Sequence, residues 1–151
     1  FWRDVQGKPG MHKLVEVLEG AELIVGYNIL RFDFPVIKKH YKNKSQYRDH
    51  LLKSLDVFFR VKEISGYWPK LDALLVVNRM ACKTSSGLEA IKMWREDRLD
   101  ELQTYCEGDV RQTARLALRK TLRVDHQLIL PNHVFGVSSK LASMHHGNAL
   151  N

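Results

Sequence analysis

A short apolar run, Glu22–Tyr27, constrains the fold most, because it combines β-branched residues at its centre with the length of a single strand. A second run of this kind, Ser54–Phe59, follows after a stretch in which Pro35 suits the first turn of a helix. A strand, a helix and a second strand in this order predict two parallel strands. We therefore expect an α/β fold in which the first strand is buried on both faces.

Helical patterns fill most of the remaining chain. Apolar residues at helical spacing predict a helix over 11–18, ended by Gly20, and a helix around Val36, Ile37 and Tyr41. Further helices are predicted over 71–75, 88–94 and 99–119. A loop at Gly66, Trp68 and Pro69 precedes the first of these, and a turn at 84–87 precedes the second. We expect one domain over residues 1–124. The periodicity weakens beyond it, which predicts a partly flexible C-terminal extension over residues 125–151.

The composition fits a globular protein. The 151 residues are 44% hydrophobic and 27% charged, a balance that allows a core to be buried. Cys82 and Cys106 lie far apart in a chain too large to depend on a disulfide, which favours reduced thiols in an intracellular, cytoplasmic location. No apolar run is long enough to span a bilayer, and Phe1–Asp4 lacks a signal-peptide layout, so we expect no membrane partner.

Positive charge is concentrated after the first predicted strand and the polar residues that follow it. The formal net charge is +7, and between Lys38 and Lys53 six basic residues stand against one acid, Asp49. Such a segment suits a polyanion such as nucleic acid, but it is equally typical of a solvated helix and loop. Tyr41 and Tyr47 lie among these charges, where they are either platforms for bases or ordinary surface residues.

Asp109 is a carboxylate on the expected inward face of the last helix. That face carries Leu99, Leu102, Cys106, Val110, Thr113 and Ala117. A carboxylate there needs a cation, hydrogen-bond donors or a proton. Tyr105, four residues earlier, projects from the same side of the helix. A local salt bridge for Asp109 and a core position for Tyr105 are the alternatives.

Asp33 also has two interpretations. It precedes Phe34 and Pro35, where it would cap the new helix by accepting hydrogen bonds from the first-turn amides. Asn28 and Asp33 also follow the carboxyl end of a predicted strand, which is where open α/β sheets form their ligand crevice. The second interpretation places a carboxylate in a binding site.

Two motifs in this order resemble those of a known enzyme class. Asn28-x-x-x-Phe32-Asp33 and Tyr105-x-x-x-Asp109 are similar to the second and third motifs of DEDD 3′-to-5′ exonucleases, in their DEDDy branch, within the ribonuclease H-like superfamily. The segments Ser54-Leu-Asp-Val-Phe and Leu71-Asp-Ala-Leu, and the stretch 87–106, resemble the YprB-like predicted exonuclease domains of that superfamily. The resemblance covers roughly 1–118.

The resemblance implies a fold, a reaction and a set of roles. It implies a mixed sheet flanked by helices and hydrolysis of phosphodiester bonds at the 3′ end of single-stranded DNA or RNA. Asp33 and Asp109 would hold Mg²⁺ or Mn²⁺ and Tyr105 would orient the attacking water. Asn28 and Phe32 would shape the cleft for the terminal nucleotide. The basic segment adds Lys38 and Lys39 as candidate substrate-binding residues.

The first motif of the class, Asp-x-Glu on the first strand, has no match before Asn28. The resemblance therefore implies a sheet that lacks its first strands, with the edge of Glu22–Tyr27 left to be covered. We expect an upstream segment, a partner chain or a second copy to complete it. Two other functions remain open: an exonuclease-like module that binds nucleic acid or protein without cleavage, and a structural subunit whose binding survives chelation and Asp109→Ala.

Overall fold

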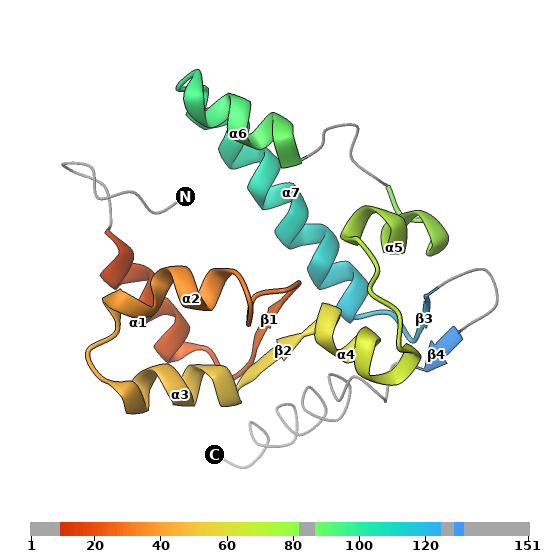
Figure 1. The fold of residues 1–151 in the computed structure, drawn as a ribbon, viewed down its shortest axis with the longest axis horizontal. Helices are drawn as coiled ribbons and strands as arrows, with labels where there is room; N and C mark the ends of the chain where they lie inside the picture. Colours follow the sequence, from red (N-terminus) through yellow and green to blue (C-terminus); the bar gives the residue numbers. More distant parts are fainter. Residues whose placement is uncertain (1–9, 82–86, 125–128, 132–151) are drawn as a thin grey trace, which may run out of the picture. The chain divides into compact units, whose positions relative to one another are not determined.

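The computed structural model describes residues 10–81, 87–124 and 129–131, and the chain divides into two compact units (Figure 1). The first unit is Phe1–Asp56 and the second unit is Val57–Asn151. The expected turn over 84–87 falls outside the described residues except for Gly87, and so does most of 125–151. The boundary between a domain over 1–124 and an extension stays a prediction.

The first unit contains a two-stranded parallel sheet with short helices around it. Its elements are α1 (Met11–Gly20), β1 (Ile24–Gly26), α2 (Asp33–Ile37), the 3₁₀ helix η1 (Lys38–His40), α3 (Lys44–Leu52) and β2 (Ser54–Asp56). Ile24 pairs with Ser54 and Gly26 with Asp56, so both strands end at the same edge (Figure 1). The predicted parallel pair and the α/β fold are therefore confirmed.

The strands of this unit differ from the predicted ones in length and burial. β2 ends at Asp56, and the predicted continuation through Phe59 is wrong because Val57 starts a helix in which Val57 and Val61 are buried one turn apart. β1 is also shorter than predicted. Ile24 and Val25 are only half-buried among the described residues, so the expectation of burial on both faces is wrong.

The second unit is mainly helical. It contains α4 (Val57–Ser65), α5 (Leu71–Val77), α6 (Gly87–Arg95), α7 (Leu99–Ala117) and an antiparallel pair, β3 (Thr121–Arg123) and β4 (Ile129–Pro131). Helices α5 and α6 both contact α7, and Figure 1 shows α6 running beside it. The helices predicted over 71–75, 88–94 and 99–119 are confirmed.

Polar side chains help to tie these helices together. Buried Asn78, at the end of α5, donates from Nδ2 to the carbonyl oxygen of Arg123 over 2.7 Å and accepts from the Arg123 amide over 2.9 Å. At the start of α7, Arg98 forms hydrogen bonds with Glu96 and Glu101. No helix among the described residues is long and apolar enough to cross a membrane.

The buried face of α7 is rotated slightly from the predicted one. Leu102, Thr113, Leu116 and Ala117 are buried, but Val110 is 69% exposed and does not belong to the inward face. The rotation arises because Leu116 joins Leu102 and Thr113 on the packed side, which a period of 3.6 residues permits. Asp109 is half-buried at the border of this face.

Candidate functional site

A buried carboxylate holds the loop that follows β1. Asp56 is 4% exposed at the end of β2. Its Oδ1 accepts a hydrogen bond from the Asn28 amide over 2.7 Å, and its Oδ2 accepts one from the Leu30 amide over 3.0 Å. A charged acceptor with two backbone donors is a strong tie in a site of low dielectric. Asp56 therefore fixes the path of the chain between β1 and α2.

Close packing further restricts this loop. A Cβ built on Gly26 would collide with the Ile29 side chain, so glycine lets the loop fold back onto the end of β1. The backbone of Asn28 has φ of 60°, a left-handed conformation that asparagine tolerates better than most residues. The residue types at positions 26 and 28 thus suit a tight turn.

Asn28 and Phe32 lie at two ends of this turn. The Phe32 amide donates to the Asn28 carbonyl oxygen over 3.1 Å, while the Phe32 ring is 68% exposed. The side-chain oxygen Oδ1 of Asn28 is buried and has no hydrogen-bond partner among the described residues. A buried acceptor without a donor is costly, so it can receive a donor from a bound molecule.

Asp33 begins α2 and is exposed. Phe32 occupies the N-cap position, and Asp33 is the acidic residue of the first turn, where its carboxylate accepts a hydrogen bond from its own amide, one position later than predicted. Partial desolvation raises the pKa of Asp33, a hydrogen bond with its own backbone lowers that pKa, and the charge of Asp56 raises it further. Because the charge of Asp56 at the end of β2 acts on Asp33, a cation beside Asp33 would favour its ionised state.

The second unit places a phenol beside two carboxylates. Tyr105 and Asp109 share one side of α7, and both are half-buried. The pKa of Tyr105 is raised, first by desolvation and then by the charges of Asp109 and Asp72. The Tyr105 hydroxyl therefore stays protonated at neutral pH and keeps a proton to donate.

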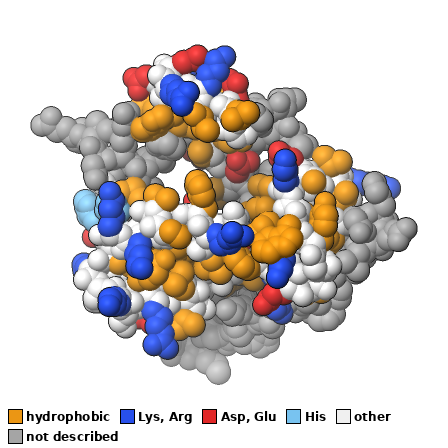
Figure 2. All heavy atoms as spheres, viewed as in Figure 1, with side chains coloured by type: hydrophobic (Ala, Val, Ile, Leu, Met, Phe, Trp, Pro, Cys, Tyr) orange, Lys and Arg blue, Asp and Glu red, His pale blue; other side chains and the backbone are white. Residues whose placement is uncertain are grey.

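Lys38 and Lys39 are exposed on η1, directly after the Asp33 helix. On the face shown in Figure 2, lysine and arginine side chains are interspersed with hydrophobic ones. Both lysines line a cavity of the first unit that is described below. Their exposure leaves them accessible to an anion, and their role in binding substrate stays a prediction.

The structure brings the predicted residues together in two groups. Asn28, Phe32 and Asp33 belong to one turn of the first unit, and Tyr105 and Asp109 belong to one helix of the second unit. Sequence reasoning assigned no role to Asp56 or Asp72. The signal was present, because both belong to segments that carried the resemblance, Ser54-Leu-Asp-Val-Phe and Leu71-Asp-Ala-Leu.

The donor set suits a hard divalent cation but is small. Mg²⁺ and Mn²⁺ prefer carboxylate oxygens, which Asp33 offers in the first unit and Asp109 in the second. Within the described parts of the chain, no group of three or more His, Cys, Asp or Glu residues is arranged to hold a metal ion. Each unit therefore offers a ligand type that a hard cation prefers, but not a complete set of ligands among the described residues.

Comparison with known proteins identifies the family. The family model described as the RNase H superfamily matches residues 5–120, a range that contains both groups of candidate residues. No curated protein and no solved structure gives a match. The match covers well over half of the chain and agrees with its mixed α/β architecture. This protein belongs to the RNase H superfamily.

Proposed function

We propose that this chain is the major part of a metal-dependent 3′-to-5′ exonuclease domain of the DEDD class, DEDDy branch, similar to the YprB-like domains. The observation that carries the proposal is the paired-carboxylate arrangement in the first unit. There Asp33 follows the turn that leaves β1, and its pKa is raised by desolvation and by the charge of Asp56, which ends β2. Membership in the RNase H superfamily supports a nuclease that binds nucleic acid, and nucleases of this superfamily generally use divalent metals.

The side chains have distinct roles in this proposal. Asp33 and Asp109 hold Mg²⁺ or Mn²⁺, which when bound would supply Lewis-acid stabilisation and a more acidic water. Tyr105, protonated because its pKa is raised, donates a hydrogen bond that orients the attacking water. Asn28 uses its buried, unpartnered Oδ1 to accept a donor from the terminal nucleotide. The exposed Phe32 ring packs against the base of that nucleotide.

Two further carboxylates complete the site in this proposal. They come from an Asp-x-Glu segment supplied by an upstream region or a partner chain, because the sequence itself contains no Asp-x-Glu that a second copy could supply. The same segment would pair with the edge of β1 that β2 leaves open in the described part of the sheet. Activity is therefore expected to rise when that segment is present.

Digestion of end-labelled single strands in manganese tests the proposal. The chain should be compared with a version extended at its N-terminus and with Asp109→Asn and Tyr105→Phe in that version. We expect the strands to be shortened from the 3′ end. Asp109→Asn is expected to lower the rate of digestion about 100-fold or more, because even groups that only support a metal ligand contribute about 10–100-fold. Loss of one orienting hydrogen bond in Tyr105→Phe is expected to cost about 10-fold.

Asp100→Asn is the matched control, because Asp100 is an exposed aspartate in the first turn of the same helix. It should leave the rate unchanged. Shortening from the 5′ end, or equal rates for Asp109→Asn and Asp100→Asn, would contradict the assigned roles. Absence of digestion by every version would overturn the exonuclease proposal.

A second function is favoured by one observation. The described residues contain no group of three metal-ligating side chains, which suits a module that binds nucleic acid or a protein partner without cleaving. Such a module would bind strands equally in manganese and in EDTA and would leave them intact in both. The digestion assay with the extended version separates the two functions.

A further inference from the structure

A cavity in the first unit lies beside the candidate carboxylate loop but contains no carboxylate. Its volume is about 570 Å³, and it is formed by the end of α2, by η1 and by the start of α3. Three lysines, Lys38, Lys39 and Lys44, and two tyrosines, Tyr41 and Tyr47, line it. The remaining lining includes an apolar wall from α2. Its chemistry is cationic and aromatic.

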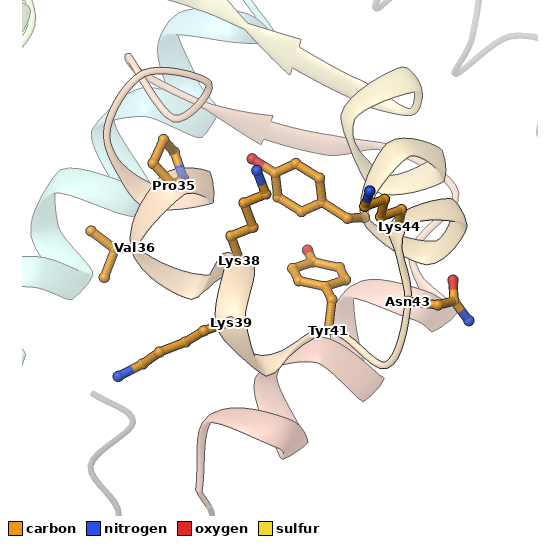
Figure 3. A pocket seen from close by; sticks show the side chains of 8 residues that line it. Pro35, Val36, Lys38, Lys39, Tyr41, Asn43 and Lys44 are labelled. Carbon is orange, nitrogen blue, oxygen red and sulfur yellow. The ribbon is translucent and has the colours of Figure 1, made fainter.

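The lysines are available to a ligand. All three are exposed, and none forms a salt bridge with another described residue. The Lys38 ammonium lies 5.5 Å from the centre of the Tyr47 ring. Figure 3 shows Lys38 beside Tyr41, while Lys39 extends away from them. Lys38, from η1, and Lys44, from the start of α3, thus line the cavity from two elements, and Lys39 lies at its rim.

A buried histidine, anchored by an exposed glutamate, holds the aromatic wall in place. The Tyr41 hydroxyl lies 3.0 Å from Nδ1 of His50, whose Nε2 lies 2.7 Å from Oε2 of Glu19. His50 is 1% exposed. The rings of Tyr41 and Tyr47 meet edge to face with centroids 5.1 Å apart. A side chain fixed in this way loses little conformational entropy on binding, which favours the binding of a ligand in this cavity.

The Tyr41 phenol also stays neutral. Burial, with smaller contributions from Tyr47 and Glu19, raises the pKa of Tyr41 to about 12. A neutral phenol adds no negative charge to the cavity and leaves the lysines unopposed. The cavity therefore favours a ligand that combines negative charge with a flat apolar group.

We propose that this cavity binds one nucleotide of a single-stranded nucleic acid, with its phosphate on Lys38 and Lys44 and its base against the rings of Tyr41 and Tyr47. The choice of nucleic acid rests on the proposed function. An unpaired base is required because only a free face can stack on an aromatic side chain. Volumes of about 300–1,000 Å³ are typical for small-ligand pockets, so one nucleotide fits. Without carboxylates in its lining, the cavity binds without a metal.

Fluorescence anisotropy of a labelled ten-nucleotide single strand in EDTA tests this inference. The pocket variant Lys38→Gln/Lys44→Gln is compared with Lys70→Gln/Lys92→Gln, which removes the same charge from two exposed lysines of the second unit. We expect the pocket variant to bind the strand about 10-fold more weakly and with a smaller dependence on salt, because both lysine contacts with the phosphate are lost. The control pair should change binding less than about 2-fold.

An abasic strand of the same length tests the base contact of the cavity in a Phe32→Ala background, which removes the other base contact proposed above. It should bind this background about 10-fold more weakly than a normal strand does, since stacking of a single base is usually worth a factor of this size. Equal weakening by the two lysine pairs would overturn the site, because it would indicate diffuse electrostatics. Equal binding of abasic and normal strands would overturn the base contact.

The same variants separate this inference from the proposed function. If strands are digested but the pocket variant binds and digests normally, the cavity inference fails and the exonuclease proposal stands. If no version digests but the pocket variant alone loses binding, the inference stands and the exonuclease proposal fails. When both hold, the pocket variant raises KM and leaves kcat unchanged, because the lysines contact a nucleotide away from the reacting bond.

Discussion

The two units position their candidate residues by different means. In the first unit, Asp33 follows a turn whose amides are held by buried Asp56, at the end of a neighbouring strand. In the second unit, Tyr105 and Asp109 are four residues apart on the 19-residue helix α7. The turn depends on a contact between residues distant in sequence, whereas the helix depends on local periodicity. The first site is therefore expected to be the more fragile.

The electrostatics of the two units differ as well. Desolvation, and to a smaller extent nearby carboxylates, raise the pKa of an acid in the first unit, Asp33, and of a phenol in the second, Tyr105. For the acid, the raised pKa means that ionisation is costly in the absence of a cation. For the phenol, it means that the proton is retained. The same physical effect thus favours cation binding in one unit and hydrogen-bond donation in the other.

The largest effect that would test this comparison is expected for Asp56→Ala. Removing the carboxylate leaves the amides of Asn28 and Leu30 without their acceptor. We expect the free energy of unfolding to fall by about 3 kcal/mol, since hydrogen bonds to charged groups contribute about 1.5–3 kcal/mol each and two are lost together. Urea denaturation measures the change, and hydrogen exchange should show it concentrated in residues 24–33.

Asp72→Ala is the matched control in the second unit, because Asp72 is an exposed aspartate whose charge acts on Tyr105. Its stability should change by less than about 0.5 kcal/mol, as for most surface substitutions. A loss as large as that of Asp56→Ala would break the comparison. It would mean that the second unit also depends on a polar interaction between residues distant in sequence.

A smaller loss is expected for Gly26→Ala. The new Cβ would collide with the Ile29 side chain, and overpacking of this kind usually costs about 1–3 kcal/mol. In an Ile29→Ala background the obstructing atoms are gone, so the added cost of Gly26→Ala should fall below about 0.5 kcal/mol. A double-mutant cycle by thermal or urea unfolding measures this coupling.

Gly20→Ala serves as the control for this cycle, because no atom lies within 4 Å of the Cβ position at Gly20. It should be neutral or slightly stabilising at the end of α1. If Gly26→Ala is equally harmless, the turn is not closely packed against β1. In that case the turn before Asp33 depends less on tertiary contacts than we expect.

The smallest effect is a pH dependence that belongs to Asp33. Its folded pKa is raised above the ordinary 3.8, so the native state binds more protons than the unfolded state between the two values. The free energy of unfolding therefore falls as pH rises through that window. Asp33→Asn removes this dependence, and the variant should be more stable than the unchanged chain at neutral pH.

Urea titrations from pH 3 to neutral pH measure the effect. The difference between Asp33→Asn and the unchanged chain should vanish below the ordinary aspartate pKa of 3.8 and be largest above the raised one. Parallel stability curves for the two proteins would show that neither desolvation nor Asp56 acts on Asp33 as described. The pKa of Asp33 and that of Tyr105 would then not be raised by the same physical effect.

Much of the local architecture was predictable from the sequence, because it depends on short-range patterns. The parallel pairing of the first two strands follows from the order strand, helix, strand. The helix that carries Tyr105 and Asp109 follows from apolar spacing over 19 residues. The end of β2 did not follow, because Val57, Phe58 and Phe59 favour a strand by type, and the burial of Val57 and Val61 one turn apart favours the helix instead.

The residues that support the candidate site were harder to predict than the site itself. Asp56 contacts amides 26 and 28 positions away, and a separation of that size leaves no periodic signal in the sequence. The link from Glu19 through His50 to Tyr41 likewise joins three separate segments. Val110 was placed on the wrong side of α7, because only the packing of Leu116 decided which edge of the apolar face is covered.

The sequence by itself determined the two motifs, the order of the elements and the concentration of basic charge after β1, because these are properties of residue type and spacing. Only the tertiary structure decided that Asp56 holds the turn before Asp33, that Asp72 acts on Tyr105 and that lysines and tyrosines enclose a cavity. The physical reason is the distance in sequence over which these interactions act. Hydrogen bonds and desolvation depend on which distant groups fold together, and no local pattern specifies that.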